Sequence, residues 1–129
     1  MHRVFIEEFH DTDISISIVW IRMLEGDSEE AAILSAATFS GDSRFEQFYD
    51  PNQLVGKSVA QSLGVEEDVV AWDIYLFYGI GELWTESPPI PVEWMHQLVN
   101  SEWADPAHLY RGEDLINRLR DVTLRLLSE

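Results

Sequence analysis

Val69-Val70-Ala71-Trp72-Asp73-Ile74-Tyr75-Leu76-Phe77-Tyr78 is the stretch that decides the predicted fold. Alternate positions from Val70 to Tyr78 are all apolar or aromatic, and the positions between them are apolar or aromatic apart from Asp73. A strand with two apolar faces is typical of the covered middle of a sheet. We therefore predict a sheet centred on residues 69–78, ended by Gly79-Ile80-Gly81.

A second strand is predicted over residues 14–24 and is expected to join the same sheet, because its isoleucines alternate with serines. Residues 31–39 are ambiguous. Their alanines and a capping box from Asp27 to Glu30 favour a helix. Their position after a Gly-Asp turn instead favours a hairpin strand. We favour the strand, because Thr38-Phe39-Ser40-Gly41 resembles a strand end.

Three helices are predicted to pack against this sheet, at about residues 51–63, 92–99 and 113–127. The first has Asp50 as a cap, Pro51 at the first position and Gly64 as its end. The second starts at Pro91, and the third is amphipathic. The predicted fold class is α+β, with a small mixed or antiparallel sheet, and residues 1–129 are expected to form a single acidic domain.

Charge is the unusual feature of the composition. The 129 residues hold 24 Asp and Glu against 8 Lys and Arg, a net charge of −16. Residues 58–110 contain no Lys or Arg, whereas residues 111–129 hold half of all the cations. Such acidity argues against direct binding of nucleic acid or of an anionic membrane.

Other classes of protein are excluded by what the composition lacks. The absence of cysteine excludes disulfides, thiol nucleophiles and Cys-ligated metals. The sequence also lacks the roughly 20 consecutive apolar residues of a membrane-spanning helix. The acidic start predicts no signal peptide, so we expect a cytoplasmic protein.

Candidate chemistry is sparse, and no cofactor is expected. His10, Asp11 and Asp13 offer metal ligands, but no second histidine follows at ligand spacing, so a polar turn is favoured. Asp73, within the apolar strand, and His96 are candidates for acid–base catalysis. Gly79-Ile80-Gly81 lacks the third glycine of a dinucleotide-binding loop.

The aromatic residues offer the more specific hypothesis. Three tryptophans lie in or beside two consecutive segments: Ser87-Pro88-Pro89-Ile90-Pro91, which we expect to be extended and exposed, and the short helix predicted after it. Tryptophan is a favoured interface anchor, although these rings could also clamp the segment onto the protein's own core. The predicted partner-binding residues are Trp84, Trp94, Trp103, Glu82, Glu86, Glu93 and Glu102.

The leading interpretation is a non-catalytic, acidic adaptor or regulator that binds a basic partner protein. A DNA mimic, whose carboxylates stand in for phosphates, is a special case. One alternative is a small cytoplasmic enzyme that uses Asp73 and His96 or the His10 metal site. Another is an assembly subunit of a homo- or hetero-oligomer.

Overall fold

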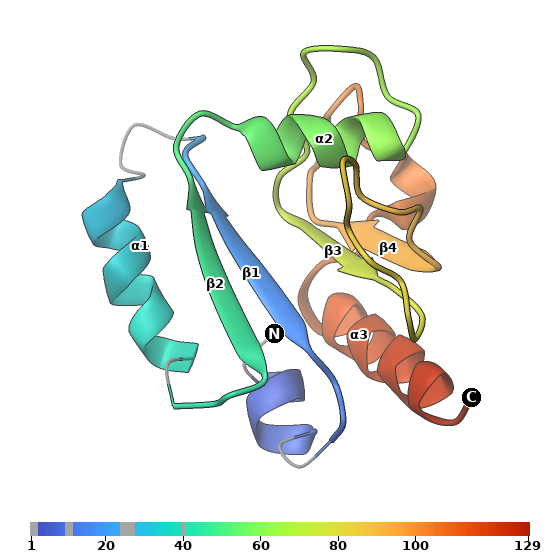
Figure 1. The fold of residues 1–129 in the computed structure, drawn as a ribbon. Coiled ribbons are helices and arrows are strands. Elements are labelled where there is room, and N and C mark those ends of the chain that lie inside the picture. The colour runs from blue at the N-terminus through green and yellow to red at the C-terminus, as the bar shows by residue number, and fades with distance from the viewer. Residues whose placement is uncertain (1–2, 10–11, 24–27, 40) are drawn as a thin grey trace. The chain divides into compact units, whose positions relative to one another are not determined.

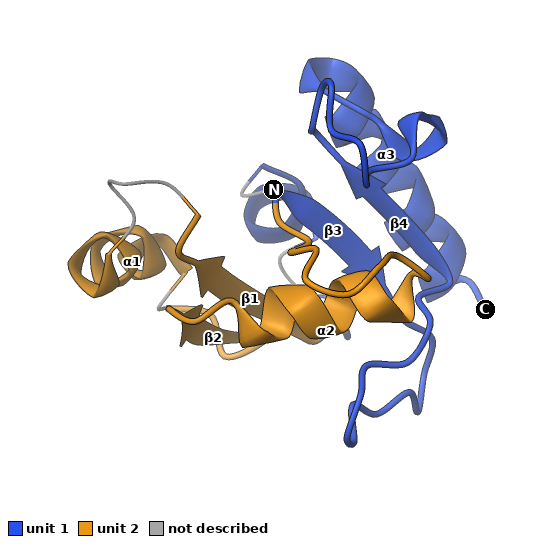
Figure 2. Cartoon of the chain, turned by 90° about the horizontal axis from the view of Figure 1, so that it is seen from above, with its two compact units in different colours: residues 1–13, 73–129 blue, residues 14–72 orange. Residues whose placement is uncertain are grey.

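The computed structural model describes residues 3–9, 12–23, 28–39 and 41–129. The chain forms two compact units (Figure 2). Unit 1 contains residues 1–13 and 73–129, and unit 2 contains residues 14–72. The expectation of a single domain stays a prediction, because two compact units can fold together or separately.

Unit 2 is built around two parallel strands (Figure 1). β1 (Ile16–Ile21) runs beside β2 (Phe45–Asp50), with Ile16 opposite Phe45 and Ile21 opposite Asp50. Parallel neighbours require a crossover connection, and α1 (Glu29–Ala36) lies in that connection. The alternation of isoleucine and serine therefore located β1 correctly, whereas its partner strand was not predicted.

The preference for a strand at residues 31–39 was wrong. These residues form most of α1, followed by a 3₁₀ turn at Ala37–Phe39. The Ser28 hydroxyl accepts a hydrogen bond from the Ala31 N–H at 3.1 Å, and Glu29 and Glu30 occupy the first turn. This cap and the acidic first turn stabilise a helix start, so the helical propensity of the alanines prevails.

The helix predicted at residues 51–63 is confirmed as α2 (Leu54–Ser62). Buried Asp50 ends β2, and its carboxylate accepts hydrogen bonds from the Leu54, Val55 and Gly56 N–H groups at 2.9, 2.9 and 3.2 Å. Pro51 precedes the helix in a turn. Asp50 therefore satisfies the first free N–H groups of α2 from outside the helix.

Unit 1 holds an antiparallel pair, β3 (Ile74–Phe77) and β4 (Glu93–His96), and a long C-terminal helix, α3 (Gly112–Leu127). A π-helical turn at Arg3–Glu8 packs on α3, and a 3₁₀ turn at Pro106–His108 lies next to β4. The helix predicted at residues 113–127 is confirmed as α3. Its buried side chains are Leu115, Leu119, Val122 and Thr123.

The α+β class is confirmed, but the sheet differs from the prediction. Residues 14–24 and 69–78 do not share one sheet, because β1 pairs only with β2 and β3 only with β4 among the described strands. The strand predicted at 69–78 is only β3, whose residues are half-buried. Asp73 has a left-handed φ of 51°, which interrupts an extended chain directly before Ile74.

The prediction of a helix at residues 92–99 was wrong, because this segment contains strand β4. The Val92 N–H donates to the Phe77 carbonyl at 2.8 Å, and the Tyr75 and Leu76 positions pair with Met95 and Trp94. Proline at position 91 is compatible with the start of either a helix or a strand. Pairing with β3 therefore decides the conformation, and this pairing is not visible in the local sequence.

Candidate functional site

The connection between β3 and β4, residues 78–92, is the feature around which the candidate site is built; we call it the β3–β4 arm. It is the long loop that extends away from the two strands in Figure 2. Loops longer than about 12–15 residues without helices or strands are uncommon in compact domains, and those that occur are usually functional or disordered.

The arm is held at its C-terminal end by prolines. Pro88 and Pro91 are buried, whereas Ile90 is exposed. A polyproline II chain has three residues per turn, so positions 88 and 91 share one face. The expectation that residues 87–91 would be exposed throughout was therefore wrong, because Pro88 and Pro91 are buried.

The rest of the arm presents large apolar side chains to solvent. Ile80, Leu83, Trp84 and Ile90 are 99%, 76%, 46% and 77% exposed. Ile80 is at the tip of a turn in which the Glu82 N–H approaches the Gly79 carbonyl at 3.4 Å and Gly81 has a φ of +83°. Glycine adopts this φ at no steric cost, so the turn holds Ile80 out into solvent.

Trp84 is among the residues predicted to bind a partner, whereas Ile80, Leu83 and Ile90 were not predicted. The signal for Ile80 was available, because an isoleucine between two glycines lies in a segment that favours turns. Such a residue has no helix or strand face on which to be buried. The same reasoning applies to Ile90, which stands between prolines.

Two carboxylates on the arm are exposed. Glu82 and Glu86 flank Trp84 in sequence, and the structure describes no ion pair for either of them. Glu102, in the segment that follows β4, is also exposed. These three predicted residues are therefore accessible to a partner.

Glu93 is placed differently from the other predicted carboxylates. Its two oxygens lie 3.0 Å from the Arg118 guanidinium and 3.2 Å from that of Arg125, both on α3. Arg118 also lies over the Tyr110 ring, with 5.7 Å between its Cζ and the ring centroid. The charge of Glu93 is therefore compensated within unit 1, and the residue ties β4 to α3.

The other two predicted tryptophans lie in a half-buried aromatic cluster. The Trp94 ring stacks on His108 at a centroid distance of 4.0 Å and an interplanar angle of 13°. His96 lies between Trp94 and Trp103, at centroid distances of 6.0 and 6.2 Å. No ring contact joins Trp84 to these two tryptophans in the part of the chain that the structure describes.

His96 is fully buried, and both of its ring nitrogens have partners. Its Nε2 lies 2.8 Å from the Asp105 carbonyl, and its Nδ1 lies 3.0 Å from the Leu98 N–H. A carbonyl only accepts and an N–H only donates, so the proton lies on Nε2. His96 thus fixes the segment that follows β4, and His108 does the same by donating from Nδ1 to the Trp94 carbonyl at 2.7 Å.

Comparison with protein-family models, curated proteins and solved structures gives no match.

Asp73, the other candidate catalytic residue, is exposed and precedes β3. Its Oδ1 accepts a hydrogen bond from the Gln97 Nε2 at 2.9 Å. Burial raises the pKa of Tyr75, and the negative charge of Asp73 adds to this shift. Burial likewise raises the pKa of Tyr78. Asp73 thus interacts with Gln97, directly after β4, and with Tyr75 in β3.

The proposed metal ligands His10 and Asp11 lie outside the described residues. Within the described ranges, no group of three His, Asp or Glu side chains could hold a metal ion. Within the same ranges, no helix is both long and apolar enough to cross a bilayer.

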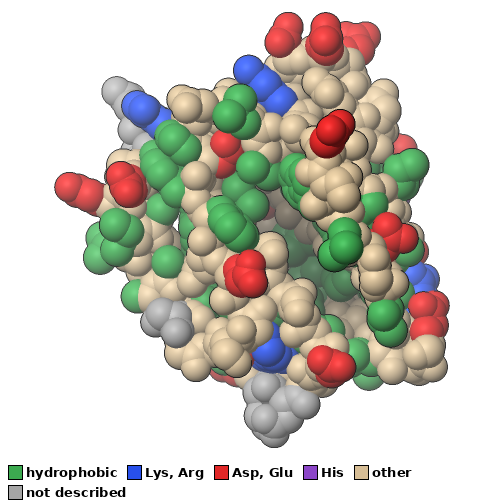
Figure 3. Space-filling view, viewed as in Figure 1, with side chains coloured by type: hydrophobic (Ala, Val, Ile, Leu, Met, Phe, Trp, Pro, Cys, Tyr) green, Lys and Arg blue, Asp and Glu red, His purple; other side chains and the backbone are tan. Residues whose placement is uncertain are grey.

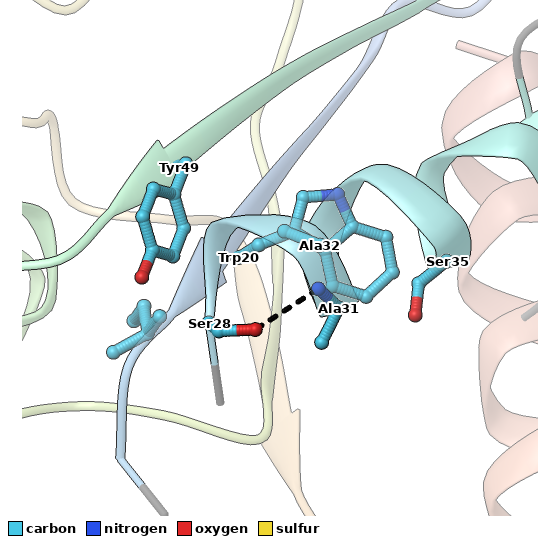
Figure 4. Close-up of a pocket in the computed structure, with 7 residues that line it drawn as sticks. Trp20, Ser28, Ala31, Ala32, Ser35 and Tyr49 are labelled. Atoms are coloured by element: carbon cyan, nitrogen blue, oxygen red, sulfur yellow. Dashed lines mark hydrogen bonds between the residues drawn. The ribbon is translucent and has the colours of Figure 1, made fainter. Parts of the chain in front are cut away.

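Unit 2 contains a small hollow of about 140 Å³ beside α1 (Figure 4). Trp20 lines this hollow together with residues of α1, and its Nε1 donates to the Gln47 Oε1 at 3.1 Å. Ser28, at the rim, caps α1, as the dashed line in Figure 4 shows. The Trp20 N–H and the Ser28 hydroxyl, two polar groups at this hollow, therefore already have hydrogen-bond partners within unit 2.

Proposed function

We propose that this chain is a non-catalytic protein-interaction module that docks on a basic partner protein through the β3–β4 arm. The observation that carries the proposal is the exposure of Ile80, Leu83, Trp84 and Ile90 on an arm anchored by buried prolines. Exposed apolar side chains that are gathered together and bordered by polar residues mark interaction sites, whereas isolated ones do not. An anchored loop also loses less conformational entropy on binding than a free one.

The charge of the surroundings supports a basic partner. Glu82 and Glu86 lie beside the apolar side chains, and no Lys or Arg occurs between residues 58 and 110. Complementary charge steers association and discriminates against acidic partners. A cysteine-free chain is compatible with the expected cytoplasmic location of this interaction.

The predicted contact residues take two different roles in the proposal. Trp84, Glu82 and Glu86 touch the partner, and Glu102 contributes a peripheral steering charge. The other three residues, Trp94, Trp103 and Glu93, instead support the base of the arm. The two rings contact His108 and His96, and Glu93 pairs with arginines of α3.

Capture of host proteins on immobilised chain tests the proposal, with a matched pair of variants. Leu83 and Leu34 are 76% and 77% exposed, but Leu34 lies on α1 in unit 2. We expect wild type and Leu34→Ala to retain the same basic protein and Leu83→Ala to lose most of it. Salt should release the protein by screening the carboxylates.

Two results count against the proposal. If Leu83→Ala retains everything that wild type retains, the arm is not the docking site. If the protein that Leu83→Ala fails to retain is acidic, the carboxylates do not have the role that we propose for them. An assembly subunit would instead capture further copies of its own chain.

A further inference from the structure

We propose that the β3–β4 arm recognises an arginine side chain of its partner, which stacks on Trp84 and donates hydrogen bonds to Glu82 and Glu86. This inference rests on the proposed function, and it specifies the chemical group that the arm binds. The arm supplies an indole ring that is 46% exposed and two exposed carboxylates within two residues of it.

The rest of the molecule shows how this chain holds arginine. Arg118 lies over the Tyr110 ring and pairs with Glu93 at 3.0 Å. Arg44 lies 5.9 Å from the Phe45 ring centroid and pairs with Asp42 at 2.7 Å. In each unit, therefore, an arginine is held between an aromatic face and a carboxylate.

The arm has the same two kinds of group without the cation. No ion pair or cation–π contact is described for Trp84, Glu82 or Glu86. The nearest cations in the sequence are Lys57 and Arg111, on either side of the 58–110 segment. A cation supplied by another molecule would complete the arrangement.

Arginine fits this combination better than lysine does. The planar guanidinium stacks on an aromatic ring while its edge donates to carboxylate oxygens, and it is less strongly hydrated than an ammonium group. Lysine offers a compact charge that meets the carboxylates but cannot stack. The exposed indole is therefore the group that distinguishes the two cations.

The experiment uses two labelled peptides of equal length and charge, in which leucine alternates with either arginine or lysine. Fluorescence anisotropy at physiological salt measures their binding to the full chain. We expect the arginine peptide to bind about fivefold more tightly than the lysine peptide. Trp84→Leu should abolish this preference, and Glu82→Gln with Glu86→Gln should weaken both peptides.

Phe48→Leu is the matched control, because Phe48 is a 50% exposed aromatic residue in unit 2. This variant should keep the preference, and thermal melting should show that all variants remain folded. Equal binding of the two peptides to wild type overturns the arginine inference. So does an equal loss of preference in Phe48→Leu and Trp84→Leu.

The proposed function fails in a different way. It fails if the Leu83→Ala variant keeps the host partner, whatever the peptides do. Loss of the host partner together with equal peptide affinities would leave the docking arm in place and remove only the choice of arginine.

Discussion

The tryptophans predicted to form one binding site are divided between an exposed arm and a half-buried cluster. Trp84 has no described ring contact, whereas Trp94 stacks on His108. A large exposed ring without a stacking partner in its own chain contributes less to stability than a stacked one, but can contribute much to an interface. The two residues should therefore respond in opposite ways to truncation.

Trp84→Ala should change the free energy of unfolding by less than about 0.5 kcal/mol. It should weaken partner binding by roughly 2 kcal/mol, about 30-fold in Kd, as truncation of an interface hot spot does. Urea denaturation and a binding titration measure the two quantities. A variant that unfolds more easily but binds normally would show that Trp84 is a core residue.

Trp94→Ala should destabilise the protein by about 2 kcal/mol, because the His108 ring loses its stacking partner and half-buried apolar area is lost. Trp94→Phe, which keeps a ring, should recover a large part of this loss. Urea denaturation under the same conditions compares the variants. Wild-type stability in Trp94→Ala would mean that the cluster contributes nothing.

Among single residues, the sequence indicated which side chains could be exposed, whereas their role in binding a partner stays a prediction. Trp84 lies near the proline segment, where cover by a sheet core was less certain, and it is exposed together with Glu82 and Glu86. The pairing of Glu93 with Arg118 and Arg125 was not predictable, since these cations are 25 and 32 residues away on α3. Such a contact depends on the tertiary structure.

At the level of elements, Asp50 joins β2 to α2. Asp50→Ala should lower the free energy of unfolding by about 1–3 kcal/mol, because three N–H groups at the start of the helix lose a buried acceptor. Glu46→Ala, at an exposed position of the same strand, should stay within about 0.5 kcal/mol of wild type. Chemical denaturation measures both. Equal effects of the two variants would contradict the capping role.

An ion pair between Glu8 and Arg120 joins the Arg3–Glu8 turn to α3, and its strength depends on pH because the Glu8 carboxyl can be protonated. Arg120 donates to both oxygens of Glu8 at 2.6 Å, and these hydrogen bonds hold the pKa of the Glu8 carboxyl below its ordinary value of 4.5. A carboxylate with a lowered pKa stabilises the fold above its unfolded pKa. That contribution is lost as the pH falls through the lowered value.

Glu8→Gln should therefore melt below wild type at neutral pH, and the gap should close as the pH falls from about 5 towards 3. Thermal melting over this range provides the measurement, and Glu46→Gln, at an exposed position of β2, is the control. A gap that is constant with pH would show that the substitution acts through packing rather than through charge.

Helices and strands that are indicated by a pattern within their own residues were predicted correctly. Alternation located β1, and amphipathic spacing located α3. β2 and β4 were missed, because what makes Phe45–Asp50 and Glu93–His96 strands is pairing with distant residues. The strand predicted over the apolar run at 69–78 was too long for a related reason, because the run does not indicate the left-handed backbone at Asp73.

At the scale of the whole molecule, the excess of acid is the dominant property. The described ion pairs involve five arginines, and the acidic residues far outnumber all the cations. Figure 3 shows Asp and Glu side chains at several separate places on one face, with few Lys or Arg among them. Carboxylates distributed in this way repel one another over distances that salt can screen, because the Debye length is about 10 Å at 0.1 M.

Moderate salt should therefore raise the melting temperature. The test compares wild type with a variant in which Glu66→Gln, Glu67→Gln and Asp68→Asn remove three adjacent exposed acids. Asparagine suits position 68, where φ is +68°, because it tolerates left-handed backbone better than most residues do. The variant should melt above wild type at low salt, since its acidic side chains repel one another less, and the difference should narrow as sodium chloride approaches physiological strength.

A melting temperature that does not change with salt in either protein would show that the acidic side chains are too far apart, or too well compensated, to destabilise the fold. In that case the carboxylates of the β3–β4 arm would keep the role that we propose for them, because contact with a basic partner depends on their position beside Trp84 and not on the net charge.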